Sequence, residues 1–416
     1  MEHFPVEVVG NILSHFRTAR DVVVASVTCK KWKEAFLYHL HSLTFSGYDF
    51  WLIYHCDHSI DRIQSIITQT ILQTKGLQCL SFFLIDFDDE FSADHVLTWL
   101  MHTRDTLREL NLYVRIYPSI NILERCHWKK LEELELGHIS IARGVGSYQK
   151  FPCLKTLRLE DVTVSALELR ILLSLCPKIE NLTLVNLVLD STATVELSSV
   201  SLKTIDFLAI RFEKFTLKAD SLENLHLQMC NFMLFKVVGK GTLKVLNIND
   251  VRIRYFDIGD RMENLEIVDV KDFTIKGSKL YHMISRSSNL RRLRLWHVKF
   301  LNVHEVIDLE RISASFPQLT NLSLYYNVEE TRFSLQGSSH LQNVAVLELG
   351  CASYYGFSDW VAGIMERCPN LKKIAIHRFD CEKKLCEDLG LLVDFSSSMV
   401  RLARKYLQVE FQFNYE

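Results

Sequence analysis

The sequence predicts an α/β fold built as a solenoid, in which short parallel strands follow one another along the chain. Two observations predict it. A pattern of apolar residues, LxxLxL with apolar exchanges, recurs fourteen times between residues 40 and 376, about 19 to 37 residues apart. The returns between copies show helical spacing of apolar residues near both ends of the array, but not between residues 200 and 262. Three short helices are expected ahead of this array.

Each copy of the pattern is expected to form one short strand. Alternate side chains of a strand point to opposite faces, so the leucines face the interior and the residues between them face the concave side. The copies are LHSLTF (40–45), LQCLSF (77–82), LRELNL (107–112), LEELEL (131–136), LKTLRL (154–159), IENLTL (179–184), LKTIDF (202–207), LENLHL (222–227), LKVLNI (243–248), MENLEI (262–267), LRRLRL (290–295), LTNLSL (319–324), VAVLEL (344–349) and LKKIAI (371–376).

The returns vary with their length. Four of the six prolines end such returns, since proline cannot continue a helix. Between residues 200 and 262 the spacing falls to about 20 residues, which is too short for a full helix and predicts short strands on the convex side. Helices are expected in five longer returns, at 95–105, 166–175, 280–287, 306–315 and 360–367.

This array resembles a leucine-rich repeat, and the resemblance covers residues 41–416, with about fourteen repeats. It implies a horseshoe-shaped solenoid with a β-rich middle. Bacterial-type and extracellular repeats usually place asparagine in the turn after the strand. Only Asn327 fits that position here, so we expect the hydrogen-bonding groups of the turn backbone to be satisfied in another way.

Composition limits the classes of partner and compartment. The formal net charge of −2 gives no basic excess, so neither nucleic acid nor a membrane surface is expected as the main partner. The first residues lack a basic segment followed by an apolar run, and no run approaches 18 apolar residues. The eleven cysteines are scattered singly, without a CxxC pair, which favours free thiols in the cytosol or nucleus.

Residues 1–40 carry a different pattern. FPVEVVGNILSHF (4–16) places proline at a helix start and apolar residues at helical spacing, and ARDVVVASVT (19–28) and KKWKEAFLYHL (30–40) predict two more short helices. With its Pro5, Ser26 and Trp32, the segment 3–40 resembles the F-box motif, close to LPxEVxxxILSxL followed by DLxxxSxVCKxWR. Phenylalanine replaces two usual leucines, and Thr28 replaces a valine.

The resemblance implies docking to the Skp-type adaptor of a cullin–RING ubiquitin ligase, and through it to the cullin. An F-box ahead of leucine-rich repeats resembles a substrate receptor, most closely of the plant type, with an unknown target protein bound by the repeats. The same architecture leaves open a non-degradative scaffold or a small-molecule sensor with its ligand on the concave face. The resemblance implies adaptor contact by Phe4, Pro5, Val8, Ile12, Leu13, Phe16, Val22, Ser26, Cys29 and Trp32.

Strand alternation predicts which side chains reach the concave face. Arg294 and Trp296 fall on one strand and Tyr325 on the next, so the two aromatic side chains are expected to be lateral neighbours. Arginine, tryptophan and tyrosine are enriched in binding hot spots, although the aromatics could also simply stack and stiffen the face. The predicted substrate-binding residues are Arg158, His226, Arg294, Trp296, Tyr325 and His377.

No motif predicts catalysis, a cofactor or a metal. The sequence contains no phosphate loop, nucleophile elbow or HExxH. The segments HCDH (55–58) and CEKKLC (381–386) lack the second ligand pair of a structural zinc site, and we interpret HCDH as a loop. The acidic stretch DFDDEF (86–91) is interpreted as a solvated loop. We therefore expect a non-catalytic subunit without a cofactor.

Overall fold

The computed structural model describes residues 4–57, 59–85, 90–141, 150–189, 194–259, 262–302, 304–327, 333–334, 339–351, 355–378 and 389–415. It divides into two compact units. Unit 1 comprises residues 1–202 and 206–218, and unit 2 comprises residues 203–205 and 219–416. Among the described residues no helix is both long and apolar enough to cross a membrane.

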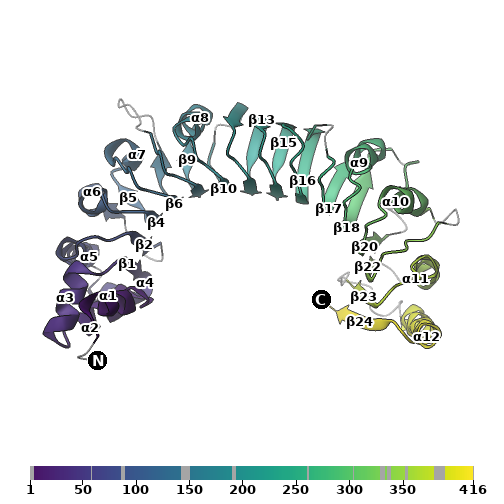
Figure 1. Ribbon diagram of the computed structural model, residues 1–416, viewed down its shortest axis with the longest axis horizontal. Helices are drawn as coiled ribbons and strands as arrows, with labels where there is room; N and C mark the ends of the chain where they lie inside the picture. The colour runs from purple at the N-terminus through teal and green to yellow at the C-terminus, as the bar shows by residue number, and fades with distance from the viewer. Residues whose placement is uncertain are drawn as a thin grey trace. The chain divides into compact units, whose positions relative to one another are not determined.

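Unit 1 begins with helices that precede and flank its first strand (Figure 1). Thr18 caps α2 by accepting the backbone N–H of Asp21 at 3.1 Å, and Ser59 caps α5 in the same way. His55 lies within α4, so the interpretation of HCDH as a loop was wrong for this residue. The helices are α1 (Val6–Ser14), α2 (Ala19–Ser26), α3 (Lys30–Tyr38), α4 (Gly47–Asp57) and α5 (Ile60–Gln73).

Six strands of unit 1 form a parallel ladder in chain order. The register aligns the pattern leucines, as in Leu134 beside Leu157, and both of these are fully buried. The outward residues therefore form continuous rows across the ladder. The strands are β1 (Ser42–Ser46), β2 (Cys79–Phe83), β4 (Glu109–Tyr113), β6 (Glu133–Gly137), β8 (Thr156–Glu160) and β10 (Asn181–Val185).

The returns of unit 1 carry helices on the side away from the outward rows (Figure 1). The capping box of α8 joins Ser165 and Glu168. Two short parallel pairs, β3 with β5 and β7 with β9, complete these returns. The elements are β3 (Phe91–Ser92), α6 (Ala93–Thr103), β5 (Ile116–Tyr117), α7 (Ile122–Arg125), β7 (Ser140–Ile141), β9 (Thr163–Val164) and α8 (Ala166–Ser174).

The middle of the chain is rich in strands, as the short spacing predicts. Residues 194–259 are all described and contain no helix. The returns in this region are extended strands. Strand β16 is continuous: its first part pairs with β14 in the main ladder, and its second part forms the return and pairs with β15. The strands are β11 (Thr194–Ser199), β12 (Thr204–Leu208), β13 (Arg211–Ala219), β14 (Asn224–Gln228), β15 (Asn231–Val238) and β16 (Val245–Asp257).

Unit 2 continues with the parallel ladder β14-β16-β17-β18-β20-β22-β23-β24. Thirteen of the fourteen LxxLxL copies coincide with strands, whereas the copy MENLEI (262–267) is wrong by three residues, because Val268 and Val270 of β17 take the buried positions beside Leu246 and Ile248. Strand β24 is one more that the pattern missed. The strands are β17 (Ile267–Ile275), β18 (Arg292–Phe300), β19 (Ile307–Asp308), β20 (Asn321–Tyr326), β21 (Phe333–Ser334), β22 (Val346–Cys351), β23 (Lys373–Arg378) and β24 (Glu410–Tyr415). The helices are α9 (Gly277–Ile284), α10 (Leu309–Ser315), α11 (Phe357–Glu366) and α12 (Leu389–Lys405).

The turn after the outward strand uses a left-handed residue instead of a repeated asparagine. The backbone N–H of this residue donates to the next repeat, as from Met229 to the carbonyl of Asn249 at 2.9 Å. Asparagine, aspartate and histidine tolerate this region best among residues with a side chain. In the described part of the chain eight such positions have φ between 46° and 58°: His138, Asp161, Asn186, Ala209, Met229, Asp250, Asp272 and His297.

Candidate binding surfaces

Three residues predicted to contact an adaptor are buried. Leu13, Val22 and Ser26 are at most 4% exposed because the N-terminal helices pack on one another there. The prediction that these three residues contact a partner directly is therefore corrected. In the structure they hold the N-terminal helices together. Phe16 and Trp32 are half-buried, at the edge of this packing.

The other predicted adaptor residues are exposed. Phe4, Val8 and Ile12 follow one another at intervals of four residues, so they lie along one side of α1 and its N-terminal extension. We call these three residues the α1 stripe; they are 49%, 38% and 37% exposed. Pro5 and Cys29 are exposed as well.

Close packing on the opposite side of α1 explains this orientation. A Cβ atom at Gly10 would lie only 2.3 Å from the backbone oxygen of His39, which follows α3. Val9 and Leu13 are buried on the same side. Because α1 packs against α3 with this side, the apolar side chains of the α1 stripe face away from α3 and are exposed to solvent.

On the concave face of unit 2, Arg294 lies between two carboxylates. Its guanidinium nitrogens are 3.5 Å from Asp269 on β17 and 3.5 Å from Glu348 on β22. Nε of Arg294 and Oε2 of Glu348 are buried without a hydrogen-bond partner among the described residues. Burial raises the pKa of Asp269 above its ordinary value, although Arg294 pulls in the opposite direction. The guanidinium of Arg294, a predicted substrate-binding group, is thus already shared by two carboxylates.

The guanidinium of Arg294 also stacks on Trp296, 4.4 Å from the centre of the indole ring. Trp296 Nε1 donates a hydrogen bond of 2.6 Å to the hydroxyl of Ser323 on the next strand. The rings of Tyr325 and His377 lie 6.0 Å and 5.6 Å from that of Trp296. The structure therefore brings together four of the six predicted substrate-binding residues.

The two aromatic side chains do not form the open surface that alternation suggested. Trp296 is 3% exposed and Tyr325 is 2% exposed. Ser323 and Gly350 are small enough to let the rings lie along the sheet, and a Cβ atom at Gly350 would be 2.6 Å from the Tyr325 ring. This burial corrects the expectation of direct aromatic contact, while Arg294 and His377 remain half-buried at the surface.

The remaining two predicted residues lie on separate surfaces. His226 is half-buried on β14, where it pairs in register with Asn247 of β16. It belongs to unit 2 but is three strands of the ladder away from Arg294. Arg158 belongs to unit 1, where it takes part in a cluster of its own.

Arg158 repeats the arrangement around Arg294. Its guanidinium is 2.7 Å from Glu160, and its Nε donates to the Tyr113 hydroxyl at 3.2 Å. Tyr113 in turn donates to Glu135 at 3.0 Å, and its ring occupies the space above Gly137. In each unit, an arginine is thus paired with at least one carboxylate near a tyrosine that covers a glycine of the next strand.

Carboxylates accumulate on the same face of unit 1. Glu109 and Glu133 are opposite each other on β4 and β6. Burial raises the pKa of Glu133, and the neighbouring carboxylates raise it further. The pKa of Cys79 is raised to about 11 by burial and by these two glutamates. The outward face of unit 1 is therefore acidic despite the single guanidinium of Arg158.

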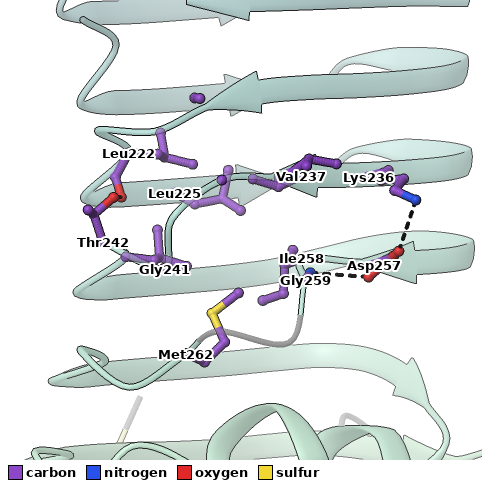
Figure 2. A pocket seen from close by; sticks show the side chains of 14 residues that line it. Leu222, Leu225, Lys236, Val237, Gly241, Thr242, Asp257, Ile258, Gly259 and Met262 are labelled. Carbon is purple, nitrogen blue, oxygen red and sulfur yellow. Dashed lines mark hydrogen bonds and ion pairs between the residues drawn. The ribbon is translucent and has the colours of Figure 1, made fainter. Parts of the chain in front are cut away.

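Unit 2 also contains a cavity of about 420 Å³ between its strands and its helix-free returns. Figure 2 shows its apolar wall, which includes Leu222, Leu225 and Met262. Lys236 and Asp257 form an ion pair of 3.6 Å at its edge. None of its lining residues is an outward residue of the ladder, so this cavity does not lie where the small-molecule alternative placed its ligand.

Sequence reasoning missed the partners of the predicted residues. Asp269, Glu348 and Glu135 are outward residues of nearby strands, and for the two glutamates the repeat pattern already contained the signal. Aligning the LxxLxL copies puts Glu135 beside Arg158, and Glu348 at the position of Arg294. Asp269 lies beyond the copy predicted for its strand (262–267), which is three residues out of register with its neighbours. The segment CEKKLC (381–386) and residues 86–89 lie outside the described residues. Where side chains are described, no group of three or more His, Cys, Asp or Glu could hold a metal ion.

Comparison with known proteins identifies the family of the chain. A family model of the leucine-rich repeats of the FBD-associated F-box protein At5g56370 matches residues 96–269. The F-box protein At1g10780 of Arabidopsis thaliana is 24% identical over 280 residues, which cover 65% of this chain and 64% of that protein. The F-box/LRR-repeat protein At1g67190 of the same plant is 49% identical over 422 residues, covering the whole of both chains. The chain therefore belongs to the plant F-box/leucine-rich-repeat proteins.

Proposed function

We propose that the chain is the substrate-recognition subunit of a Skp–cullin–F-box ubiquitin ligase. Its N-terminal helices bind a Skp-type adaptor, and the outward faces of its repeats bind the target protein. The α1 stripe is the observation that carries the proposal. Large apolar side chains aligned on an otherwise packed helix are unfavourable in water and typical of protein–protein contacts. The F-box in the names of the relatives supports the adaptor as the partner.

Recognition of the target is assigned to the outward faces because they combine charge, aromatic rings and rigidity. In unit 2 the ring of Trp296 is fixed by Ser323 and carries the guanidinium of Arg294. Such fixed groups lose little conformational entropy when a partner binds. The polar groups at this surface are Asp269, Arg294, Glu348 and His377, which suit a polar segment of a target protein.

The chain needs no reacting group for this function. A receptor holds the target near a ubiquitin-charged conjugating enzyme, so the reaction is accelerated by proximity. The adaptor and cullin supply the physical link. We accordingly assign the chain a non-catalytic role.

Adaptor binding tests the proposal most simply. The full chain is co-expressed with a Skp-type adaptor, and complex formation is measured by gel filtration and calorimetry. We expect a stable complex, and Ile12→Glu should weaken it at least tenfold because a carboxylate would be buried in an apolar contact. Val200→Glu is the matched control, since Val200 is an exposed valine of unit 1 away from these helices.

The variants also separate docking from folding. Leu13→Ala is unsuitable as a docking variant because Leu13 is in the core. Thermal melts must show that Ile12→Glu remains folded. Absence of a complex with the wild-type chain, or an undiminished affinity of folded Ile12→Glu, would contradict the proposed adaptor surface.

A further inference from the structure

A second apolar surface in unit 1 lies between α2 and α4. Val23 and Val24 of α2 form one wall, and Leu52 and Ile53 of α4 form the other. The floor includes Phe45 of β1, and the space enclosed is about 310 Å³. We call this surface the α2–α4 groove. Its volume is at the lower end of the range of small binding pockets.

Helix α2 carries apolar residues on a second, exposed side as well as on its buried side. Ala19, Val22 and Ser26 are buried against the unit. Val23, Val24 and Val27 lie on another side of the helix, where they are 36%, 59% and 75% exposed. Since valine is a poor helix former, its repeated use on a solvent-facing side is not explained by helix propensity.

Helix α4 likewise carries large apolar side chains that are exposed. Phe50 is buried, whereas Tyr48, Trp51 and Leu52 are 82%, 56% and 67% exposed. Residues spaced by three and four positions share one side of a helix, so these three form a stripe. Of the exposed apolar residues on the two helices, Val23, Val24 and Leu52 line the groove itself. Clustered exposed residues of this kind are a usual mark of an interaction site.

The charges at the groove define the partner further. Arg20 and Asp49 are the charged residues that line it. The carboxylate of Asp49 accepts the backbone N–H of Ser46 at 2.9 Å and is also hydrogen-bonded by Thr18 and the backbone of Arg20. Arg20 is exposed and, among the described residues, has no carboxylate within ion-pair distance. The groove therefore presents an apolar trough with one available cation.

We propose that the α2–α4 groove binds an amphipathic helix of a partner protein, whose apolar side enters the groove and whose flank carries a carboxylate toward Arg20. An apolar trough between two helices accepts the side chains at positions i, i+3, i+4 and i+7 of such a helix. The charge of Arg20 selects an acidic flank and disfavours a basic one. This surface is separate from the α1 stripe and goes beyond the proposed adaptor docking.

Designed peptides test the groove with the full chain. One fluorescent, stapled helical peptide of about four turns carries leucines at i, i+3, i+4 and i+7 with glutamates on its flanks, and a second carries lysines instead. Fluorescence anisotropy should show saturable binding of the acidic peptide and at least tenfold weaker binding of the basic one. Leu52→Glu should reduce binding of the acidic peptide at least tenfold. Leu167→Glu is the matched control, an exposed leucine on α8 of the same unit.

A charge exchange makes the test specific. Arg20→Glu should reverse the preference, so that the basic peptide binds better than the acidic one. Ile12→Glu on the α1 stripe should leave peptide binding unchanged, which separates failure of this inference from failure of the adaptor proposal. Equal binding of both peptides, or no effect of Leu52→Glu in a variant with an unchanged melting temperature, would overturn the inference. So would a wild-type dimer that Leu52→Glu converts to a monomer, because the occupant would then be a second copy.

Discussion

The ring of Tyr325 occupies the space above Gly350 in which any other residue would place its side chain. A Cβ atom at Gly350 would lie 2.6 Å from Cδ2 of Tyr325 and 3.7 Å from Cη2 of Trp296. Tyr113 and Gly137 have the same relationship in unit 1, where the corresponding distance is 2.3 Å. A glycine in one strand therefore decides whether the tyrosine of the preceding strand is buried or projects from the face.

The first prediction concerns this contact. Gly350→Ala should destabilise the chain by about 1–3 kcal/mol, because the ring must move out of a packed position. In a Tyr325→Ala background the same substitution should cost almost nothing. Urea denaturation of the four chains forms a double-mutant cycle that measures the coupling. A cost at Gly350 that is independent of Tyr325 would show that the ring does not lie over the glycine.

The second prediction concerns the left-handed turns. Met229 has φ of 53°, where an L-residue costs about 1–2 kcal/mol. Met229→Gly should remove this strain and stabilise the chain by about 0.5–1 kcal/mol after the entropic cost of glycine. Met233→Gly is the control, since Met233 is an exposed methionine within β15. It should destabilise, and effects of the same sign in thermal melts would contradict the strained turn.

The third prediction tests the phase of the strands. Leu225 is fully buried, whereas its neighbour His226 faces outward and is half-buried. Leu225→Ala should cost about 2–5 kcal/mol because it leaves a cavity in the core. His226→Ala should cost less than about 1 kcal/mol. Equal losses of stability in denaturant titrations would mean that the assignment of inward and outward residues on this strand is wrong.

The fourth prediction concerns pH and Asp269. Its pKa is raised above the ordinary value of 3.8, mainly because burial disfavours the charged carboxylate. The folded chain then holds this proton more tightly than the unfolded chain. The contribution of Asp269 to stability therefore falls as the pH rises through the window between 3.8 and the raised pKa. It is constant at higher pH.

Asp269→Asn isolates that contribution. The stability of the wild-type chain relative to Asp269→Asn should increase as the pH falls from neutral toward 4, while other acid effects cancel between the two chains. Chemical denaturation at several pH values measures the difference. A relative stability that instead falls with decreasing pH would show that the ion pair with Arg294 outweighs burial.

Much of the fold was predictable because each repeat buries the same positions. The LxxLxL period placed thirteen of the fourteen strands and set that of β17 three residues early, and helical spacing placed the helices of five longer returns. Helices α5 and α12 were not predicted. Helix α4 was missed because GYDFWLIYHCD is apolar on every side and shows no amphipathic period. Strand β24 was missed because it lacks the pattern, and its Phe413 is 41% exposed.

The binding surfaces were less predictable for a physical reason. Alternation states which side a residue faces, but its burial depends on the residues of the neighbouring strands. Trp296 is covered because Ser323 and Gly350 are small, and Arg294 is neutralised because Asp269 and Glu348 occupy the same register. These are properties of pairs of strands, which a reading of one strand at a time does not reveal.

The central claim is that the chain delivers bound targets for ubiquitination, and Ile12→Glu allows a direct measurement. Proximity labelling and ubiquitin-remnant profiling are compared in plant cells that express the wild-type chain or this variant at equal levels. The account predicts that Ile12→Glu still labels the wild-type set of targets, while their ubiquitination falls to the level of cells without the chain. Ubiquitination of those targets that does not depend on Ile12, or on the chain at all, would contradict a receptor function and favour a scaffold.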